Sequence, residues 1–217
     1  MLGSLFNNPI LFFYSAIALL AAISIHEFAH AWTADRLGDP NPRLDGRLTL
    51  NPLAHLDLVG TLLLLIAHFG WGKPVRFDPY NLKNPRRDAA LISLAGATAN
   101  MMLAALCAII LRILPVVFIP SAVGLFNTMD IIITGLLQAV IVMNVSLGIF
   151  NLIPIHPLDG FKVVEGLLPE NAARQWHQLE SLGYIMLFIF VFPIFGSSAV
   201  LSVVYTLTNT IITFLIP

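Results

Sequence analysis

The sequence predicts an all-α polytopic membrane protein, with a small β-hairpin and a re-entrant segment between its first and second full spans. Of the 217 residues, 58% are hydrophobic and only 11% are charged, and the mean hydropathy is +0.86. Soluble domains carry about 25% charged residues. A water-soluble fold could not bury this much apolar surface, so the bilayer must act as solvent.

Long uncharged runs are the second observation. Residues 9–34 form the first run, and Glu27 is its only Asp, Glu, Lys or Arg. We expect a retained helix there, because the preceding residues have no basic n-region and the run has no small-residue cleavage pattern. Residues 89–111 and 131–155 are uncharged runs of 23 and 25 residues. Each reaches the roughly 20 residues that a spanning helix needs.

The end of the chain is also apolar. Residues 181–217 carry no charged side chain, and Pro193 and Gly196 interrupt them. One long kinked element and two short ones both fit this pattern. We interpret 1–217 as one membrane-embedded domain, with its core at about 9–168 and a C-terminal hydrophobic segment at 181–217.

Two features are expected between the first and second spans. The polar stretch 40–57 predicts a short hairpin with Asp45-Gly46 as its turn. Residues 58–70 are apolar but number only thirteen. That length is too short to span and suits a re-entrant or interfacial segment.

Basic residues predict the orientation. Eight of the eleven Lys and Arg fall between residues 36 and 87, on both flanks of 58–70. Because Lys and Arg near spanning segments favour the cytoplasm, we expect 36–87 inside and the N-terminus outside. This predicts a multi-pass protein of the cell membrane, plasma or inner, with residues 26–30 in the inner half of the first helix.

Composition also excludes some classes of protein. Eleven scattered Lys and Arg, with a net charge of -1, build no basic face for nucleic acid. Cys107 is the only cysteine, so no internal disulfide can form.

The sequence HEFAH at 26–30 is an HExxH pattern within the first apolar run. On a helix His26 and His30 share one face, so both imidazoles can bind one metal ion. Glu27 between them can take a proton from the water that the metal activates. A chance match is common in soluble proteins. Inside a membrane helix, however, ionisable residues are expensive and functional by default.

Catalytic zinc usually takes three protein ligands. Asp159 is the candidate for the third, in NLIPIHPLDG at 151–160, where Pro154 and Pro157 end a helix and Gly160 permits a tight turn. Asp is also a preferred N-cap residue for a helix that starts near residue 161. Spacing alone leaves these two alternatives about even.

Four motifs in order then carry a resemblance: HEFAH, NPLAHLDLVG at 51–60, GWGKPV at 70–75 and FNLIPIHPLDG at 150–160. Together they resemble the site-2 protease family of intramembrane zinc metalloproteases, and within it the compact prokaryotic branch without PDZ or CBS domains. The resemblance implies a site-2 protease-like helical core and the cleavage of transmembrane segments of membrane proteins.

The resemblance also implies roles for single residues. His26, His30 and Asp159 match the zinc ligands, Glu27 matches the acid/base, and Asn151 matches an asparagine that contacts the substrate or stabilises the oxyanion. One such ligand set predicts one Zn²⁺ per chain. Asn151 can instead cap a broken helix.

The chain departs from the family pattern at two positions. In GATAN at 96–100, Ala97 stands where the family often has proline, and His156 stands where the family tends to have proline. His156 is either an adventitious ligand or neighbour of the metal, or a solvated residue at a helix end. His55 and Asp57 lie in a matched motif, where fixing the hairpin and supporting a ligand histidine are the alternatives.

Three other functions compete with proteolysis: a metal transporter, a haem-binding membrane protein, and a proteolytically inactive zinc-binding relative. A transporter needs polar residues along a path through several helices. Haem ligands need neither Glu27 nor Asp159, and the intact Glu27 argues against an inactive relative. The partners expected are a transmembrane protein substrate and the lipid bilayer. Substrate selection would come from the membrane core or from an accessory membrane protein.

Overall fold

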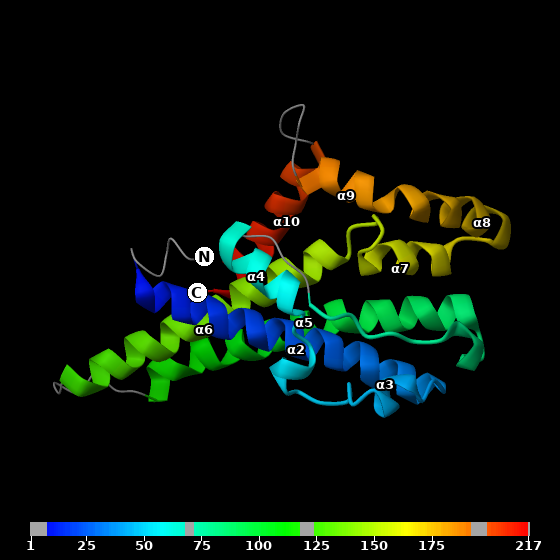
Figure 1. Ribbon diagram of the computed structural model, residues 1–217. Coiled ribbons are helices and arrows are strands. Elements are labelled where there is room, and N and C mark those ends of the chain that lie inside the picture. Colours follow the sequence, from blue (N-terminus) through cyan, green and yellow to red (C-terminus); the bar gives the residue numbers. More distant parts are fainter. Residues whose placement is uncertain (1–7, 68–71, 118–123, 192–198, 217) are drawn as a thin grey trace.

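The computed structural model describes residues 8–67, 72–117, 124–191 and 199–216 (Figure 1). Within these ranges the regular elements are helical, and none is a β-strand. The helices are α2 (Pro9–Leu37), α3 (Asn41–Leu44), η1 (Pro52–Ala54), α4 (Leu58–Ala67), η2 (Pro79–Asn81), α5 (Pro85–Val117), α6 (Gly124–Asn151), α7 (Asp159–Leu167), α8 (Glu170–Gln178), η3 (Leu179–Leu182), α9 (Gly183–Val191) and α10 (Ala199–Leu215).

Three of the described helices are long and apolar enough to cross a bilayer. They cover Pro9–Leu37, Pro85–Ile113 and Met129–Asn151, with 29, 29 and 23 residues. These are the three runs that hydropathy predicts, so a multi-pass helical membrane protein is confirmed. The C-terminal segment forms two helices, α9 and α10, on either side of residues 192–198, which lie outside the described residues.

Local sequence explains where α2 begins and ends. The Asn8 side chain accepts a hydrogen bond from the Leu11 N–H at 3.1 Å, and Pro9 occupies the first turn, where its missing N–H costs nothing. At the other end Gly38 has φ +115°, the left-handed conformation that lets its N–H reach the carbonyls of Ala34 and Asp35. The histidine pair therefore sits in the C-terminal half of a continuous helix.

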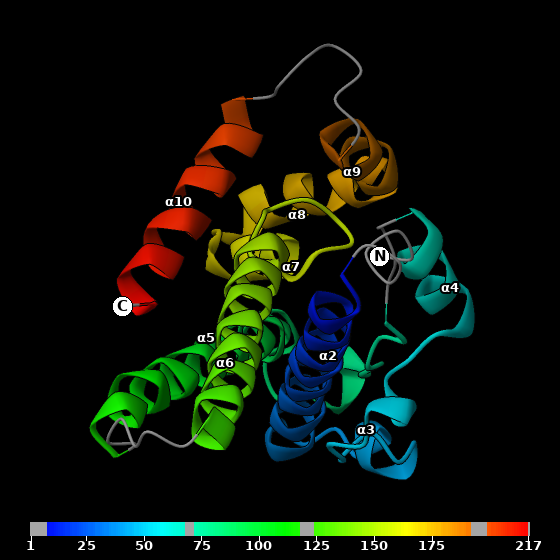
Figure 2. The ribbon, with the colours of Figure 1, turned by 90° about the vertical axis from the view of Figure 1, so that its left-hand side faces the viewer.

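Small side chains let the long helices approach closely. Helix α5 packs against both α2 and α6, while α10 packs on the side of α6 away from α2 (Figure 2). The buried positions at the centre include Ala18 on α2, Ala104 and Ala108 on α5, and Ile141 and Val145 on α6. Because lipid is as apolar as these side chains, close van der Waals packing holds such helices together.

The predicted hairpin at 40–57 is wrong. Asn41–Leu44 is a helical turn, and backbone bonds from Leu44 to Pro40 and from Arg47 to Pro42 close it at 3.0 and 2.8 Å. Prolines at 40 and 42 have no N–H to donate to a ladder, so a paired strand is unfavourable there. Gly46 nevertheless takes φ +68°, so the chain does turn at the predicted Asp45-Gly46 position.

The residues that flank the 58–70 segment meet. An isolated antiparallel bridge joins Leu56 to Gly72, and the Lys73 N–H donates to the His55 carbonyl at 2.8 Å. The described part of the segment is the ten-residue α4, and residues 68–71 lie outside the described residues. Flanking residues that meet support a segment that enters and leaves the membrane on one side.

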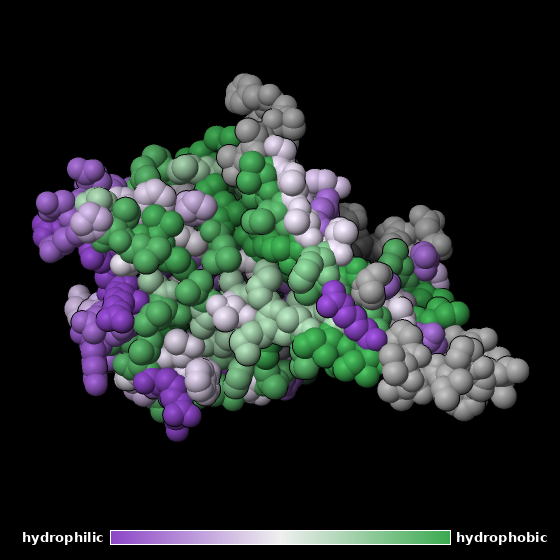
Figure 3. Space-filling view, turned by 180° about the vertical axis from the view of Figure 1, so that it is seen from behind, coloured by the Kyte–Doolittle hydropathy of each residue, from purple (hydrophilic) through white to green (hydrophobic). Residues whose placement is uncertain are grey.

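Hydrophilic side chains gather at one end of the molecule and apolar ones cover its middle (Figure 3). That end carries α3, α7, α8 and the start of α5 (Figure 1). Asp39 connects the polar stretches there, because its carboxylate accepts hydrogen bonds from the Asp78 N–H at 2.7 Å and the Asn81 side chain at 2.8 Å. The chain on both sides of 58–70 is thus at the same end.

Candidate metal centre

His26 and His30 lie on the same face of α2. Their Nε2 atoms are 2.9 Å apart, and the rings meet edge to face with centroids 4.5 Å apart. Both residues are buried, with 5% and 8% of their surface exposed. The spacing of four residues on a helix produces this arrangement directly.

Asp159 joins them from a distant part of the sequence. It is the first residue of α7, and its Oδ2 lies 3.1 Å from Nε2 of His26 and 3.2 Å from Nε2 of His30. These three are the described His, Cys, Asp and Glu residues whose ligand atoms cluster closely enough to hold a metal ion. The predicted set is therefore brought together by the fold.

Hydrogen bonds determine which ring nitrogens face the centre. Nδ1 of His26 lies 2.7 Å from Oδ1 of Asn100, and Nδ1 of His30 lies 2.7 Å from the Ile92 carbonyl. Both partners are acceptors, so each Nδ1 carries a proton, and Nε2 is the ring nitrogen that each histidine can offer to a metal ion. Sequence reasoning did not assign Asn100 or Ile92 to the site.

The three converging atoms fit a tetrahedral cation. Asp159 Oδ2 is buried and accepts no hydrogen bond from the described residues, and it faces two imidazole lone pairs. A cation at the centre of this cluster would contact all three atoms at once. Ligands about 2.0–2.1 Å from a tetrahedral zinc lie about 3.3 Å from one another, close to the 2.9, 3.1 and 3.2 Å seen here.

Gly96 on α5 packs directly against the histidine pair. A Cβ added there would lie 2.6 Å from Cε1 of His26 and from Cε1 and Nε2 of His30. The packing partner of Gly96 is thus the pair of histidine rings itself. Any larger residue would compete with the rings for space.

Glu27 faces the extended chain that follows the bridge to Gly72. Its Oε2 accepts a hydrogen bond from the Val75 N–H at 2.9 Å. The buried guanidinium of Arg47 holds the same stretch, donating to the carbonyls of Lys73 and Pro74. The carboxylate next to His26 in sequence is thus oriented by a backbone amide of an anchored segment.

Comparison with known proteins agrees with this geometry. The family model described as Peptidase family M50 matches residues 112–194 of this chain. "Putative zinc metalloprotease YwhC" of Bacillus subtilis is 36% identical over 182 residues, which are 83% of this chain and 81% of that protein. The chain belongs to peptidase family M50. Two proteins named "Putative zinc metalloprotease Rip2", from Mycolicibacterium smegmatis and Mycobacterium tuberculosis, are 32% and 30% identical over 78% of this chain and 63% of their own lengths. No solved structure matches.

Family M50 is the site-2 protease family, so the resemblance drawn from the motifs is confirmed. Asn151, which matches the family's asparagine, lies at the end of α6, and its Nδ2 donates to the Leu147 carbonyl at 3.0 Å. That contact matches the helix-capping alternative. A role toward substrate stays a prediction.

His156 does not join the three clustered residues of this M50 chain. Its Nδ1 lies 3.7 Å from Oε1 of Glu180, and its ring packs edge to face with Phe161 and Tyr184. Burial lowers the pKa of this imidazole. His156 therefore belongs to the packing between the loop before α7 and the start of α9.

His55 and Asp57 fix the loop and do not support the ligand histidines. His55 is fully buried, and its Nε2 lies 2.8 Å from the Thr49 carbonyl. Asp57 accepts from the Gly60 N–H at 2.8 Å and so caps the start of α4. The partners of the histidines come instead from α5.

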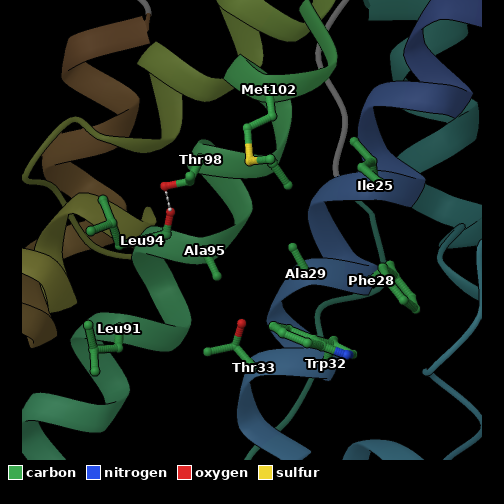
Figure 4. Close-up of a pocket in the computed structure, with 11 residues that line it drawn as sticks. Ile25, Phe28, Ala29, Trp32, Thr33, Leu91, Leu94, Ala95, Thr98 and Met102 are labelled. Atoms are coloured by element: carbon green, nitrogen blue, oxygen red, sulfur yellow. Dashed lines mark hydrogen bonds between the residues drawn. The ribbon is translucent and has the colours of Figure 1, made fainter. Parts of the chain in front are cut away.

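An apolar groove of about 340 Å³ opens between α2 and α5 (Figure 4). Its lining is Ile25, Phe28, Ala29, Trp32, Thr33, Leu91, Leu94, Ala95, Thr98, Ala99 and Met102. None of these side chains titrates, so the groove offers no ligand for a metal. The groove opens to the outside of this M50 protein, beside the three clustered residues.

Proposed function

We propose that this chain is an intramembrane zinc metalloprotease that hydrolyses peptide bonds within transmembrane segments of membrane proteins. The observation that carries the proposal is the convergence of two imidazole lone pairs and one buried carboxylate oxygen at 2.9–3.2 Å. Membership of family M50 and the names of the relatives support zinc as the metal.

In this proposal His26, His30 and Asp159 hold one zinc ion per chain. Zinc held by three protein ligands lowers the pKa of a water to about 7 and polarises a carbonyl. The three side chains form a preformed binding site, because each His Nδ1 already has a hydrogen-bond acceptor on α5. Little reorganisation then accompanies binding.

Glu27 is the general base and acid. One of its carboxylate oxygens accepts the proton of the attacking water, and the same group returns it to the leaving amide nitrogen. The Val75 N–H on Oε2 keeps the carboxylate turned toward the extended chain. The second oxygen is then available for proton transfer.

The extended chain beside Glu27 supports a binding mode for the substrate. A peptide bond within a helix has its carbonyl hydrogen-bonded, so a transmembrane substrate must unwind locally. Residues 73–78 follow the Leu56–Gly72 bridge without regular structure, and an unwound segment can pair with such an edge. The Asn151 amide, released from Leu147, would then donate to the substrate backbone or the oxyanion.

The proposed location is the cell membrane, plasma or inner, with the centre toward the cytoplasm. The bias of Lys and Arg to residues 36–87 supports this orientation. A transmembrane protein substrate and the lipid bilayer are the proposed partners, and an accessory membrane protein can assist selection.

The test is cleavage of a transmembrane model substrate by the purified protein, with and without a chelator. We expect cleavage that the chelator abolishes and zinc restores. Glu27→Gln should retain zinc but lose cleavage, since only the proton acceptor is removed. The matched control is Glu170→Gln on the exposed surface of α8, where Glu170 pairs with Arg174, and it should cleave normally. Cleavage that resists the chelator, or normal turnover by Glu27→Gln, would overturn the proposal.

A further inference from the structure

A pair of buried asparagines links three helices behind the metal centre. Asn100 on α5 and Asn144 on α6 are both 0% exposed. Polar side chains within membrane helices are expensive and are functional by default. The proposed function uses Asn100 as the acceptor for Nδ1 of His26 and assigns no role to Asn144.

The hydrogen bonds of the pair run in one direction. Asn144 Nδ2 donates to the Val140 carbonyl on its own helix at 2.9 Å, which turns its Oδ1 toward α5. Asn100 Nδ2 donates to that Oδ1 at 2.7 Å and to the Ala22 carbonyl of α2 at 3.0 Å. Both N–H groups of Asn100 are then used.

This arrangement leaves one orientation for the Asn100 amide. With Nδ2 committed to two acceptors, its Oδ1 must face Nδ1 of His26, 2.7 Å away. An oxygen there accepts only from a protonated Nδ1, so the Nε2 lone pair of His26 points at the centre. A reversed amide would place an N–H against that ring and favour the wrong tautomer.

His26 depends on this side-chain network and His30 does not. Nδ1 of His30 is held by a backbone carbonyl, that of Ile92, at 2.7 Å. Changes to the Asn100 and Asn144 side chains therefore act on His26 and leave the partner of His30 in place. Successive hydrogen bonds that share a direction also polarise one another.

We propose that Asn100 and Asn144 are positioning residues that hold His26 in its zinc-binding tautomer, so that zinc affinity depends on a side chain of α6 two hydrogen bonds away from the ligand. This inference rests on the proposed zinc site and adds the residues that support it. The alternative is a purely structural pair, because such asparagines also hold membrane helices together.

The test is zinc affinity, measured by chelator competition on folded, purified protein. Partners of zinc-ligating histidines typically change metal affinity by roughly 10–100-fold, so Asn100→Leu should weaken zinc binding by about that factor. Asn144→Leu should weaken it by a smaller factor, and the double variant should be no worse than Asn100→Leu, since both break one network. Asn144→Asp should rescue, because a protonated Asp still accepts from Asn100 and donates to Val140.

The matched control is Val145→Ala, at the next position of α6 and likewise 0% exposed. It removes packing but no hydrogen bond, so it should lower thermal stability and leave zinc affinity unchanged. If folded Asn100→Leu or Asn144→Leu binds zinc as tightly as the wild type does, the inference is overturned. The zinc site itself would still stand in that case, because the wild type binds zinc. A wild-type protein that binds no zinc would overturn the proposed function and this inference together.

A measurement on the wild-type protein tests the inference even if the variants fail to fold. Nitrogen NMR of histidine-labelled, zinc-loaded protein distinguishes the two tautomers. We expect protonated Nδ1 and metal-bound Nε2 for His26. Zinc bound to Nδ1 would overturn the inference.

Discussion

Replacing Gly96 by alanine tests how tightly the metal centre is built. The new Cβ would lie 2.6 Å from three ring atoms of His26 and His30. Nonbonded carbon atoms settle at about 3.5–4.0 Å, so the rings must retreat by about 1 Å. The clash falls on both ligands at once and on no flexible chain end.

The cost follows from the hydrogen bonds behind the rings. Each Nδ1 bond is 2.7 Å long, and a retreat of about 1 Å carries it past the usual limit of about 3.2 Å. Two bonds worth about 0.5–1.5 kcal/mol each amount to about 1–3 kcal/mol. At about 1.4 kcal/mol per factor of ten, zinc binding should weaken by roughly 5–150-fold.

The assay is chelator competition on purified Gly96→Ala, with Gly135→Ala as the matched control. A Cβ at Gly135 on α6 would lie 2.6 Å from Cε2 of the Tyr14 ring on α2, a clash of the same size against a ring outside the metal centre. Gly135→Ala should therefore disturb helix packing but keep its zinc affinity. If Gly96→Ala binds zinc as the wild type does, the centre is looser than these contacts imply and the argument fails.

Three further predictions concern the ligand, the substrate contact and the topology. Asp159→Ala should deplete zinc in metal analysis of the purified protein, and full occupancy would remove Asp159 from the ligand set. Asn151→Ala should spare folding and zinc but lower turnover by roughly tenfold or more; normal turnover with about 1 kcal/mol less stability would mean a cap only. Single cysteines at Arg43 and Lys83 should both react from the cytoplasmic side, and labelling from opposite sides would show that the chain between them crosses.

Hydropathy and one local motif predict much of this protein. The runs 9–34 and 89–111 each lie within a long helix of the structure, and the run 131–155 lies in α6 as far as Asn151, where that helix ends. Uncharged length is sufficient evidence, because in lipid a helix satisfies its own backbone. HExxH is equally local, since one helical turn brings His26 and His30 together.

Predictions that needed tertiary information were less complete. The predicted hairpin at 40–57 is wrong because turn signals do not say which partner satisfies the backbone hydrogen bonds. Here Pro40 and Pro42 exclude a β-ladder, and the Arg47 side chain donates to the carbonyls of Lys73 and Pro74. Spacing alone also left Asp159 divided between ligand and cap until the motif resemblance. A signal for Asn100 did exist, as an amide within an uncharged spanning run.

The sequence by itself determined the membrane class, the three long helices and the pair of imidazoles on one helix face, because each depends on residues within a few turns of one another. Only the tertiary structure decided what surrounds that pair. Asp159 meets His26 across 133 positions, and Asn100 meets it across 74. Such contacts depend on how closely α2, α5 and α6 pack, and that closeness comes from small side chains such as Gly96, whose neighbours no local pattern reveals.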